Sequence, residues 1–158
     1  MLTHGLQSIS PDQLEAALEP AGARLLWLEQ GRIRCGTVEE YLPFRQNKQS
    51  SLRINCHMVE QAVREQGSGA FTASGTMAVC QKERIPLAVT CGVGGLDLKT
   101  EPEQCPDLFA LTNLSVTLLA TSPKDTVDMA KTLAWFCLLY TSSALQNFPQ
   151  KAPLRCHN

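Results

Sequence analysis

The chain has 158 residues, 44% of them hydrophobic, which is enough for one globular domain with a substantial buried core. Its 14 Lys and Arg residues nearly balance its 15 Asp and Glu residues, which excludes the basic surface that nucleic-acid binding needs. The longest apolar run, residues 134–140, is far shorter than the ~20 residues of a membrane span, and no signal peptide pattern opens the chain. We therefore expect a cytoplasmic protein that binds neither nucleic acid nor membrane.

Seven cysteines are spread along the chain without any CxxC spacing and without a histidine at zinc-ligand spacing. Their number is odd, and most lie inside apolar runs. We expect free, buried thiols in a reducing compartment, and no zinc site.

The first elements have clear local signals. Ser10 and Pro11 are typical of an N-cap and a first helical residue, so a helix is expected to begin there. Residues 24–29 and 32–35 have the composition of short strands, and the Gln30-Gly31 pair between them predicts a β-hairpin.

The middle of the chain is predicted to be mainly helical. Thr37, with Glu40 three residues later, predicts a capping box and a short helix. Polar residues 45–51 are expected to form a loop. Two further helices are expected over residues 54–66 and 73–83, the first of them ending at a glycine-rich turn.

The last part of the chain predicts buried strands and a long helix. Residues 87–90 and 115–120 are continuous apolar runs, which is the pattern of strands buried on both faces of a sheet. Residues 124–140 show apolar side chains at helical spacing. The alternation predicts an α/β fold, a layered α/β/α domain with a mostly parallel or mixed central sheet over residues 1–140. Residues 141–158 are expected to be a polar tail.

Two segments after the predicted strands could carry chemistry. Gly92, Gly94 and Gly95 follow the first strand, where glycines allow a ligand close to the backbone and free N–H groups can hold a phosphate. A tight turn at a strand end explains the same glycines.

Lys124 follows the second strand, at the sheet edge where α/β proteins bind ligands, and a part-buried lysine there can act as a nucleophile. A solvated lysine in the first turn of a helix is the alternative. Asp107 is its nearest candidate partner, and it also fits a helix N-terminal carboxylate after Pro106.

At these segments the sequence resembles the pseudouridine-5′-phosphate glycosidase family, also called indigoidine synthase A-like. Three stretches carry the resemblance, together covering roughly residues 2–136. They are Thr3-His4-Gly5-Leu6 with residues 31–36, then Thr72-Ala73-Ser74-Gly75-Thr76-Met77 with residues 85–95, and finally residues 107–133 without a gap. The matched part corresponds to the N-terminal half of the family.

The resemblance implies a particular chemistry. Family members cleave the C–C bond between uracil and ribose 5-phosphate through an imine on a lysine, which Lys124 matches. Asp107 matches the ligand of a divalent metal, usually Mn²⁺. Thr72 matches a substrate threonine, and the loop of Gly92, Gly94 and Gly95 lies where the phosphate binds. The resemblance also implies a homo-oligomer, a trimer.

Several family positions differ in this sequence. Arg53 stands at the phosphate-contacting lysine, Phe71 at the first of two threonines, and Asp97-Leu98 at a His-Arg pair. The family's catalytic glutamate lies before the His-Gly motif, where the sequence has only three residues, and the family's later strands and a substrate asparagine also lie outside it. We therefore expect the glutamate, the later strands and the asparagine to be absent.

Three functions fit these observations. The first is a diverged homologue of doubtful catalytic competence that binds a phosphorylated pentose or nucleotide-like small molecule. The second is an active C–C glycosidase that receives the missing groups from another chain. The third is a non-catalytic interaction subunit.

Overall fold

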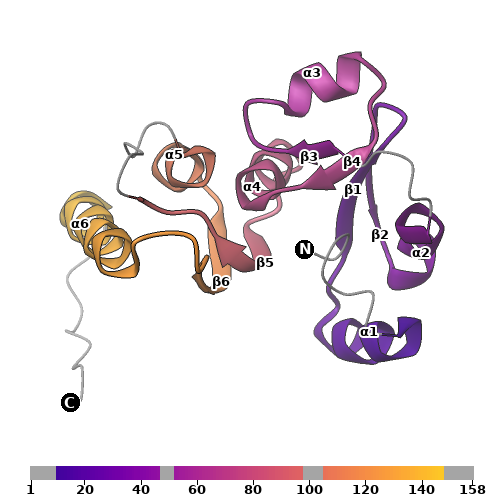
Figure 1. The fold of residues 1–158 in the computed structure, drawn as a ribbon, viewed down its shortest axis with the longest axis horizontal. Helices are drawn as coiled ribbons and strands as arrows, with labels where there is room; N and C mark the ends of the chain where they lie inside the picture. The colour runs from indigo at the N-terminus through magenta and orange to yellow at the C-terminus, as the bar shows by residue number, and fades with distance from the viewer. Residues whose placement is uncertain (1–9, 47–51, 98–104, 148–158) are drawn as a thin grey trace.

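The computed structural model describes residues 10–46, 52–97 and 105–147, with side chains up to residue 139 (Figure 1). The His-Gly motif at residues 4–5 lies outside the described residues. In chain order the elements are α1 (Pro11–Leu18), the 3-10 helix η1 (Glu19–Ala21), β1 (Leu25–Glu29), β2 (Arg32–Gly36), α2 (Val38–Gln46), β3 (Leu52–Ile54), α3 (Val59–Arg64), β4 (Gly69–Phe71), α4 (Ala73–Lys82), β5 (Leu87–Val93), α5 (Pro106–Asn113), β6 (Thr117–Pro123) and α6 (Met129–Asn147).

The first sheet is mixed, with strand order β2-β1-β4-β3. β1 pairs antiparallel with both β2 and β4, and β3 pairs parallel with β4. The predicted hairpin is confirmed: Glu29 faces Arg32 across Gln30 and Gly31, whose φ angles of 48° and 72° suit a two-residue hairpin turn. The N-cap of α1 at Ser10 and the capping box of Thr37 and Glu40 are also confirmed.

The prediction of a helix over residues 54–66 is wrong at its start. Ile54 lies in β3, opposite Phe71 of β4, and its side chain is fully buried. The chain then turns, with the amide of His57 donating to Oδ1 of Asn55, before α3 begins at Val59. Three-residue strands such as β3 and β4 depend on their partner strand rather than on their own sequence pattern.

The second sheet is the parallel pair of β5 and β6. Both strands run further than predicted, to Val93 and to Pro123. Ala88 is buried against α4 and α5, but Val89 and Leu119 are 63% and 61% exposed. The prediction that both faces of these strands are buried is therefore wrong for the described residues.

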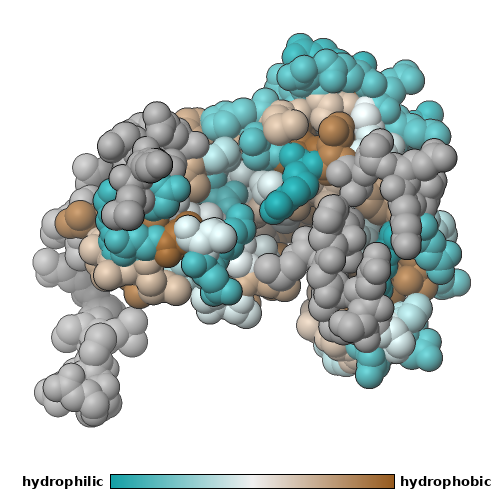
Figure 2. Space-filling view, viewed as in Figure 1, coloured by the Kyte–Doolittle hydropathy of each residue, from teal (hydrophilic) through white to brown (hydrophobic). Residues whose placement is uncertain are grey.

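Helix α4 connects the two sheets (Figure 1). Val79 packs into the cluster of Leu28 and Ile54 at the first sheet, whereas Met77 and Cys80 pack into the cluster of Ala88 at the second. On the face shown in Figure 2, hydrophilic residues cover α3 at the outer edge of the first sheet. The α/β class with a mixed sheet is confirmed, and the division into two sheets is a further feature of this fold.

Helix α6 differs from its prediction at both ends. It begins at Met129 rather than residue 124, because residues 124–127 form a turn in which the amide of Val127 donates to the carbonyl of Lys124. It continues to Asn147, so the boundary predicted at residue 140 falls inside a helix. In the part of the chain that the structure describes, no helix has both the length and the apolar character needed to cross a membrane.

The described cysteines are free, as predicted, but most are not buried. Cys80 is buried and Cys56 and Cys105 are half-buried, whereas Cys35, Cys91 and Cys137 are exposed. The prediction of buried thiols is therefore wrong for the exposed three. Cys91 lies on the face of β5 that also exposes Leu87 and Val89, whereas Cys35 lies at the end of the edge strand β2.

Gly75 fixes how closely α4 approaches β3. A methyl group there would collide with the carbonyl oxygen of Ile54. Although Gly→Ala inside a helix ordinarily stabilises by about 1 kcal/mol, we predict that Gly75→Ala destabilises the protein by about 1–3 kcal/mol through overpacking. Urea unfolding followed by circular dichroism measures this change.

Gly67→Ala is the milder comparison, because its added methyl would lie 3.2 Å from both the carbonyl oxygen of Ala62 and Cδ1 of Leu52, without the collision that occurs at Gly75. A smaller loss is expected there. Gly75→Ala as stable as the unmodified protein would contradict the close approach of α4 to β3.

Candidate functional site

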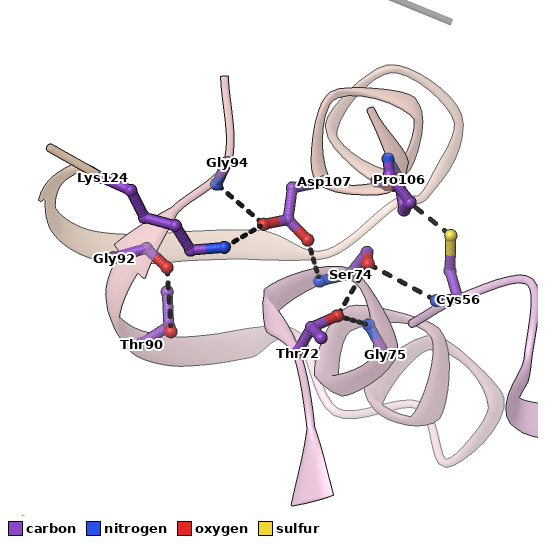
Figure 3. A network of polar contacts seen from close by, with 10 residues as sticks. All are labelled: Cys56, Thr72, Ser74, Gly75, Thr90, Gly92, Gly94, Pro106, Asp107 and Lys124. Atoms are coloured by element: carbon purple, nitrogen blue, oxygen red, sulfur yellow. Dashed lines mark hydrogen bonds and ion pairs between the residues drawn. The ribbon is translucent and has the colours of Figure 1, made fainter. Parts of the chain in front are cut away.

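The carboxyl ends of β5 and β6 lie side by side, since Val93 pairs with Pro123 at the end of both strands. Gly94 follows β5 and Lys124 follows β6. The N-termini of α4 and α5 meet at the same place, as Figure 3 shows. Ligands bind at this edge in α/β proteins, so the predicted site residues are gathered where a site is expected.

Asp107 is the centre of the site. Its side chain is 6% exposed, and both carboxylate oxygens accept backbone hydrogen bonds. Oδ1 accepts from the amide of Ser74 at 2.9 Å, and Oδ2 accepts from the amide of Gly94 at 2.7 Å. Three segments that are distant in sequence therefore meet on one buried carboxylate, which its donors stabilise.

The position of Asp107 follows from the start of α5. Pro106 is the first helical residue, so it leaves no orphaned N–H group there, and Leu108 is fully buried and fixes the helix. The carboxylate reaches the first turn of α4, where Ser74 is the second helical residue and its amide has no partner within the helix. A negative charge there is also favoured by the positive end of the α4 dipole.

Lys124 lies beside this carboxylate. Its Nζ is 3.6 Å from Oδ2 of Asp107, and its side chain is 36% exposed. The backbone is fixed by the amide of Lys124, which donates to the carbonyl of Val93 at 3.0 Å. The alternative of a solvated lysine in the first turn of a helix is wrong, because Lys124 precedes α6 and makes an ion pair.

The glycine loop is packed tightly against the site. A Cβ at Gly94 would lie 3.0 Å from Oδ2 of Asp107 and 3.1 Å from Sγ of Cys105, so a side chain there would push the carboxylate away. A Cβ at Gly95 would lie 2.5 Å from Oγ1 of Thr132. Gly92 lies within β5, opposite Ser122, rather than in the loop.

Thr132 holds α6 against the loop. It is fully buried, and its Oγ1 accepts from the amide of Leu96 at 3.0 Å and donates to the carbonyl of the same residue at 3.4 Å. The sequence gave no signal for this role, since a threonine in an apolar helix pattern looks like any other small residue. This close packing leaves no room for a side chain at Gly95.

Thr72 lies at the other side of the site. It is the N-cap of α4, with its Oγ1 accepting from the amide of Gly75, and its hydroxyl is 3.0 Å from that of Ser74. Ser74 is fully buried and was missed by sequence reasoning, because it acts mainly through its backbone amide. Its only sequence signal is its place in the first turn after an N-cap threonine.

Cys56 borders the same network. Its amide donates to Oγ of Ser74, and its Sγ donates to the carbonyl of Pro106. Burial is the main cause that raises the pKa of the Cys56 thiol, and the nearby Asp107 charge acts in the same direction. The raised pKa favours the thiol of Cys56 over the thiolate, which is the nucleophilic form.

The described residues do not fit a divalent metal at Asp107. Both carboxylate oxygens face N–H donors, and one also faces a lysine ammonium, which repels a cation. A manganese site needs several oxygen ligands, but within residues 10–46, 52–97 and 105–139 no three His, Cys, Asp or Glu side chains come together. Manganese therefore stays a prediction from the resemblance alone.

Comparison with known proteins gives the context of this site. Residues 3–138 match the model of the family described as indigoidine synthase A like protein. The pseudouridine-5′-phosphate glycosidase of Legionella pneumophila is 25% identical over 143 residues, which cover 84% of this chain and 46% of that protein. The chain thus spans about half the length of the curated relative that it matches.

Two crystal structures share the fold over 87% of this chain. One is the prealnumycin C-glycosynthase in complex with ribulose 5-phosphate, with a TM-score of 0.72, 21% identity and 47% of its own length covered. The other is an indigoidine synthase A-like protein from Thermotoga maritima, with a TM-score of 0.70, 18% identity and 49% covered.

The hydrogen bonds of Asp107 predict its contribution to stability. In Asp107→Asn, one oxygen is replaced by an NH₂ group, which faces an N–H donor or the Lys124 ammonium instead of accepting from them. We predict a loss of about 2–4 kcal/mol in the free energy of unfolding, because buried donors are left unsatisfied. Urea unfolding measures it.

Asp125→Asn is the matched control, since Asp125 is exposed in the turn next to Lys124. It should change the free energy of unfolding by no more than about 0.5 kcal/mol. Equal effects of the two substitutions would show that the Asp107 network does not stabilise the fold.

Proposed function

Because this chain belongs to the indigoidine synthase A-like family, we propose that its Lys124–Asp107 site binds an open-chain pentose 5-phosphate and forms an imine with it. The observation that carries this proposal is the lysine ammonium held 3.6 Å from a buried carboxylate at the end of a parallel strand pair. A lysine placed for solubility alone needs no such partner. The 36% exposure of its side chain leaves the amine within reach of a ligand.

The relatives support a phosphorylated sugar as the ligand class. The Legionella protein is a pseudouridine-5′-phosphate glycosidase, and the C-glycosynthase structure contains ribulose 5-phosphate. Each of the two names refers to a compound with a five-carbon sugar that carries a 5-phosphate. An aldehyde such as that of open-chain ribose 5-phosphate is the natural target of a lysine amine.

The proposed step uses only groups of the chain and its ligand. Lys124 releases a proton, for which Oδ2 of Asp107 is the neighbouring acceptor, and the free amine adds to the aldehyde carbon. The C–N bond forms as one proton moves from the nitrogen to the carbonyl oxygen. The proton held on Asp107 then passes to the resulting hydroxyl group, which leaves as water and gives the protonated imine.

Complete C–C glycosidase turnover needs more than this step, because the departing base must receive a proton. Within the described part of the site, the proton that Asp107 takes from Lys124 is used in the loss of water, and the thiol proton of Cys56 is directed at the carbonyl of Pro106. We therefore place the required acid outside the described residues, and propose ligand binding with imine formation rather than turnover by these residues alone.

The phosphate end of the ligand would lie near the glycine loop. The amide of Gly94 already donates to Asp107, and the amide of Leu96 donates to Thr132. The phosphate therefore has to be held by another group, and the amide of Gly95 is the candidate in the loop. Trimer formation, manganese and a cytoplasmic location stay predictions from the resemblance and the composition.

Borohydride trapping tests the proposal. Incubation with ribose 5-phosphate and sodium borohydride should add the mass of the sugar phosphate less one oxygen atom, and peptide mapping should place it on Lys124. We predict that Lys124→Ala abolishes the adduct, because the nucleophile is removed. The reaction is run with and without added manganese, and intact mass reports the result.

Lys131→Ala is the matched control, since Lys131 is exposed on the first turn of α6 and its ammonium donates a long hydrogen bond of 3.4 Å to the carbonyl of Asp97. It should label like the unmodified protein. No adduct, or an adduct spread over surface lysines, would contradict the proposed function while the Legionella relative labels under the same conditions.

A further inference from the structure

The glycine loop after β5 is held by the segment that joins β6 to α6. The amide of Lys124 donates to the carbonyl of Val93 at 3.0 Å, and the amide of Asp128 donates to the carbonyl of Leu96 at 2.7 Å. The third contact comes from a side chain, since Oγ1 of Thr132 accepts from the amide of Leu96 at 3.0 Å. The loop is therefore anchored at three points between the candidate nucleophile and the first turn of α6.

Thr132 supplies the one contact of these three that depends on a side chain. It is fully buried, and a Cβ at Gly95 would lie 2.5 Å from its Oγ1. Leu96 is 3% exposed, so its amide needs an acceptor within the protein. A helical threonine commonly donates its hydroxyl to its own helix, as Thr112 does to the carbonyl of Leu108. The hydroxyl of Thr132 bonds to the loop instead.

The two ends of the loop have different supports. Gly94 is held at the start by Asp107, whose Oδ2 accepts from its amide at 2.7 Å. The amide of Leu96 at the end is held by Thr132. Gly95 lies between them and is the candidate contact for the ligand phosphate. Loss of the Thr132 hydroxyl should therefore displace Gly95 and Leu96 while Gly94 keeps its carboxylate partner.

We propose that Thr132 is a positioning residue of the site, whose buried hydroxyl sets the path of the glycine loop and so strengthens binding of the phosphate end of a sugar phosphate. Both hydrogen bonds of this hydroxyl are made to the backbone of Leu96, so it acts through the loop and does not touch the ligand. The inference rests on the proposed function, because it takes the amide of Gly95 as the phosphate contact. The chemistry at Lys124 is left to the ion pair with Asp107.

Thr132→Val and Thr132→Ser separate the hydroxyl from the shape of the side chain. Valine keeps the shape, but it places a methyl group where the oxygen now lies 3.0 Å from the Leu96 nitrogen, closer than the ~3.5–4.0 Å that non-bonded carbon atoms adopt. Serine keeps the hydroxyl and loses only the methyl group. Positioning by the hydroxyl predicts that the valine variant is impaired and the serine variant is not. Packing alone predicts the larger loss for serine.

The first measurement is an NMR titration of the ¹⁵N-labelled full chain with inorganic phosphate, followed at the amide of Gly95. This resonance should shift in the unmodified protein and in Thr132→Ser. The apparent Kd should be at least about tenfold higher in Thr132→Val, because a misaligned hydrogen bond to a charged group loses about this much. Thr112→Val is the matched control, since its hydroxyl bonds within α5, and it should bind phosphate like the unmodified protein.

The second measurement is the rate of borohydride trapping on Lys124 with ribose 5-phosphate and with ribose, which lacks the phosphate. Thr132→Val should raise the half-saturating concentration of ribose 5-phosphate by about tenfold, and it should leave the rate at saturation and the reaction with ribose unchanged. An equal loss with both sugars would place the effect at the amine rather than at the phosphate, and it would contradict the proposal.

Three results of the phosphate titration overturn the proposal. They are a Gly95 resonance that does not respond to phosphate in the unmodified protein, an unchanged Kd in Thr132→Val, and equal impairment of Thr132→Ser and Thr132→Val. The titration requires no imine. A phosphate-dependent shift of Gly95 without any adduct on Lys124 therefore counts against the proposed function and not against Thr132, so the two failures are distinguishable.

Discussion

The buried carboxylate of Asp107 is the constraint on which the site and much of the packing around it depend. A buried charge without donors is destabilising by several kcal/mol, so its partners must be present when the chain is folded. Those partners come from the first turn of α4, the loop after β5 and the residue after β6. The arrangement of α4, α5 and the strand pair is thus coupled to the geometry of the candidate nucleophile. A change that displaces one donor alters both the stability of the fold and the position of the Lys124 amine.

Sequence reasoning succeeded where the signal is local. The capped start of α1 at Ser10, the hairpin at Gln30-Gly31 and the capping box at Thr37 are each determined by a few adjacent residues, and all three are present. Asp107 was also anticipated as a partner of Lys124, since it is the nearest candidate in the sequence and both residues match the family resemblance. Nζ of Lys124 lies 3.6 Å from Oδ2 of Asp107, although the two residues are 17 positions apart in the chain (124 − 107).

Sequence reasoning failed where the outcome depends on a distant partner. Ile54 has the pattern of a helix start, yet it forms a strand because β4 pairs with it. Ser74 acts through a backbone amide, which no side-chain pattern marks, and Thr132 through its fit against Gly95. The apolar runs of β5 and β6 predicted burial on both faces, and the composition of these strands fits that prediction. Val89 and Leu119 are nevertheless exposed, because no described helix packs on that face of the strand pair.

Amide hydrogen exchange at Ser74 and Gly94 tests the central claim most directly. Neither amide donates to the regular pattern of its own helix or strand, so protection of both has one source, the carboxylate of Asp107. The account predicts slow exchange at both positions, and a joint loss of protection in Asp107→Asn that leaves the core amides of β1 protected. Exchange of either amide at the rate of an unprotected backbone in the unmodified protein would contradict the account, because Asp107 would then not hold α4 and the glycine loop together.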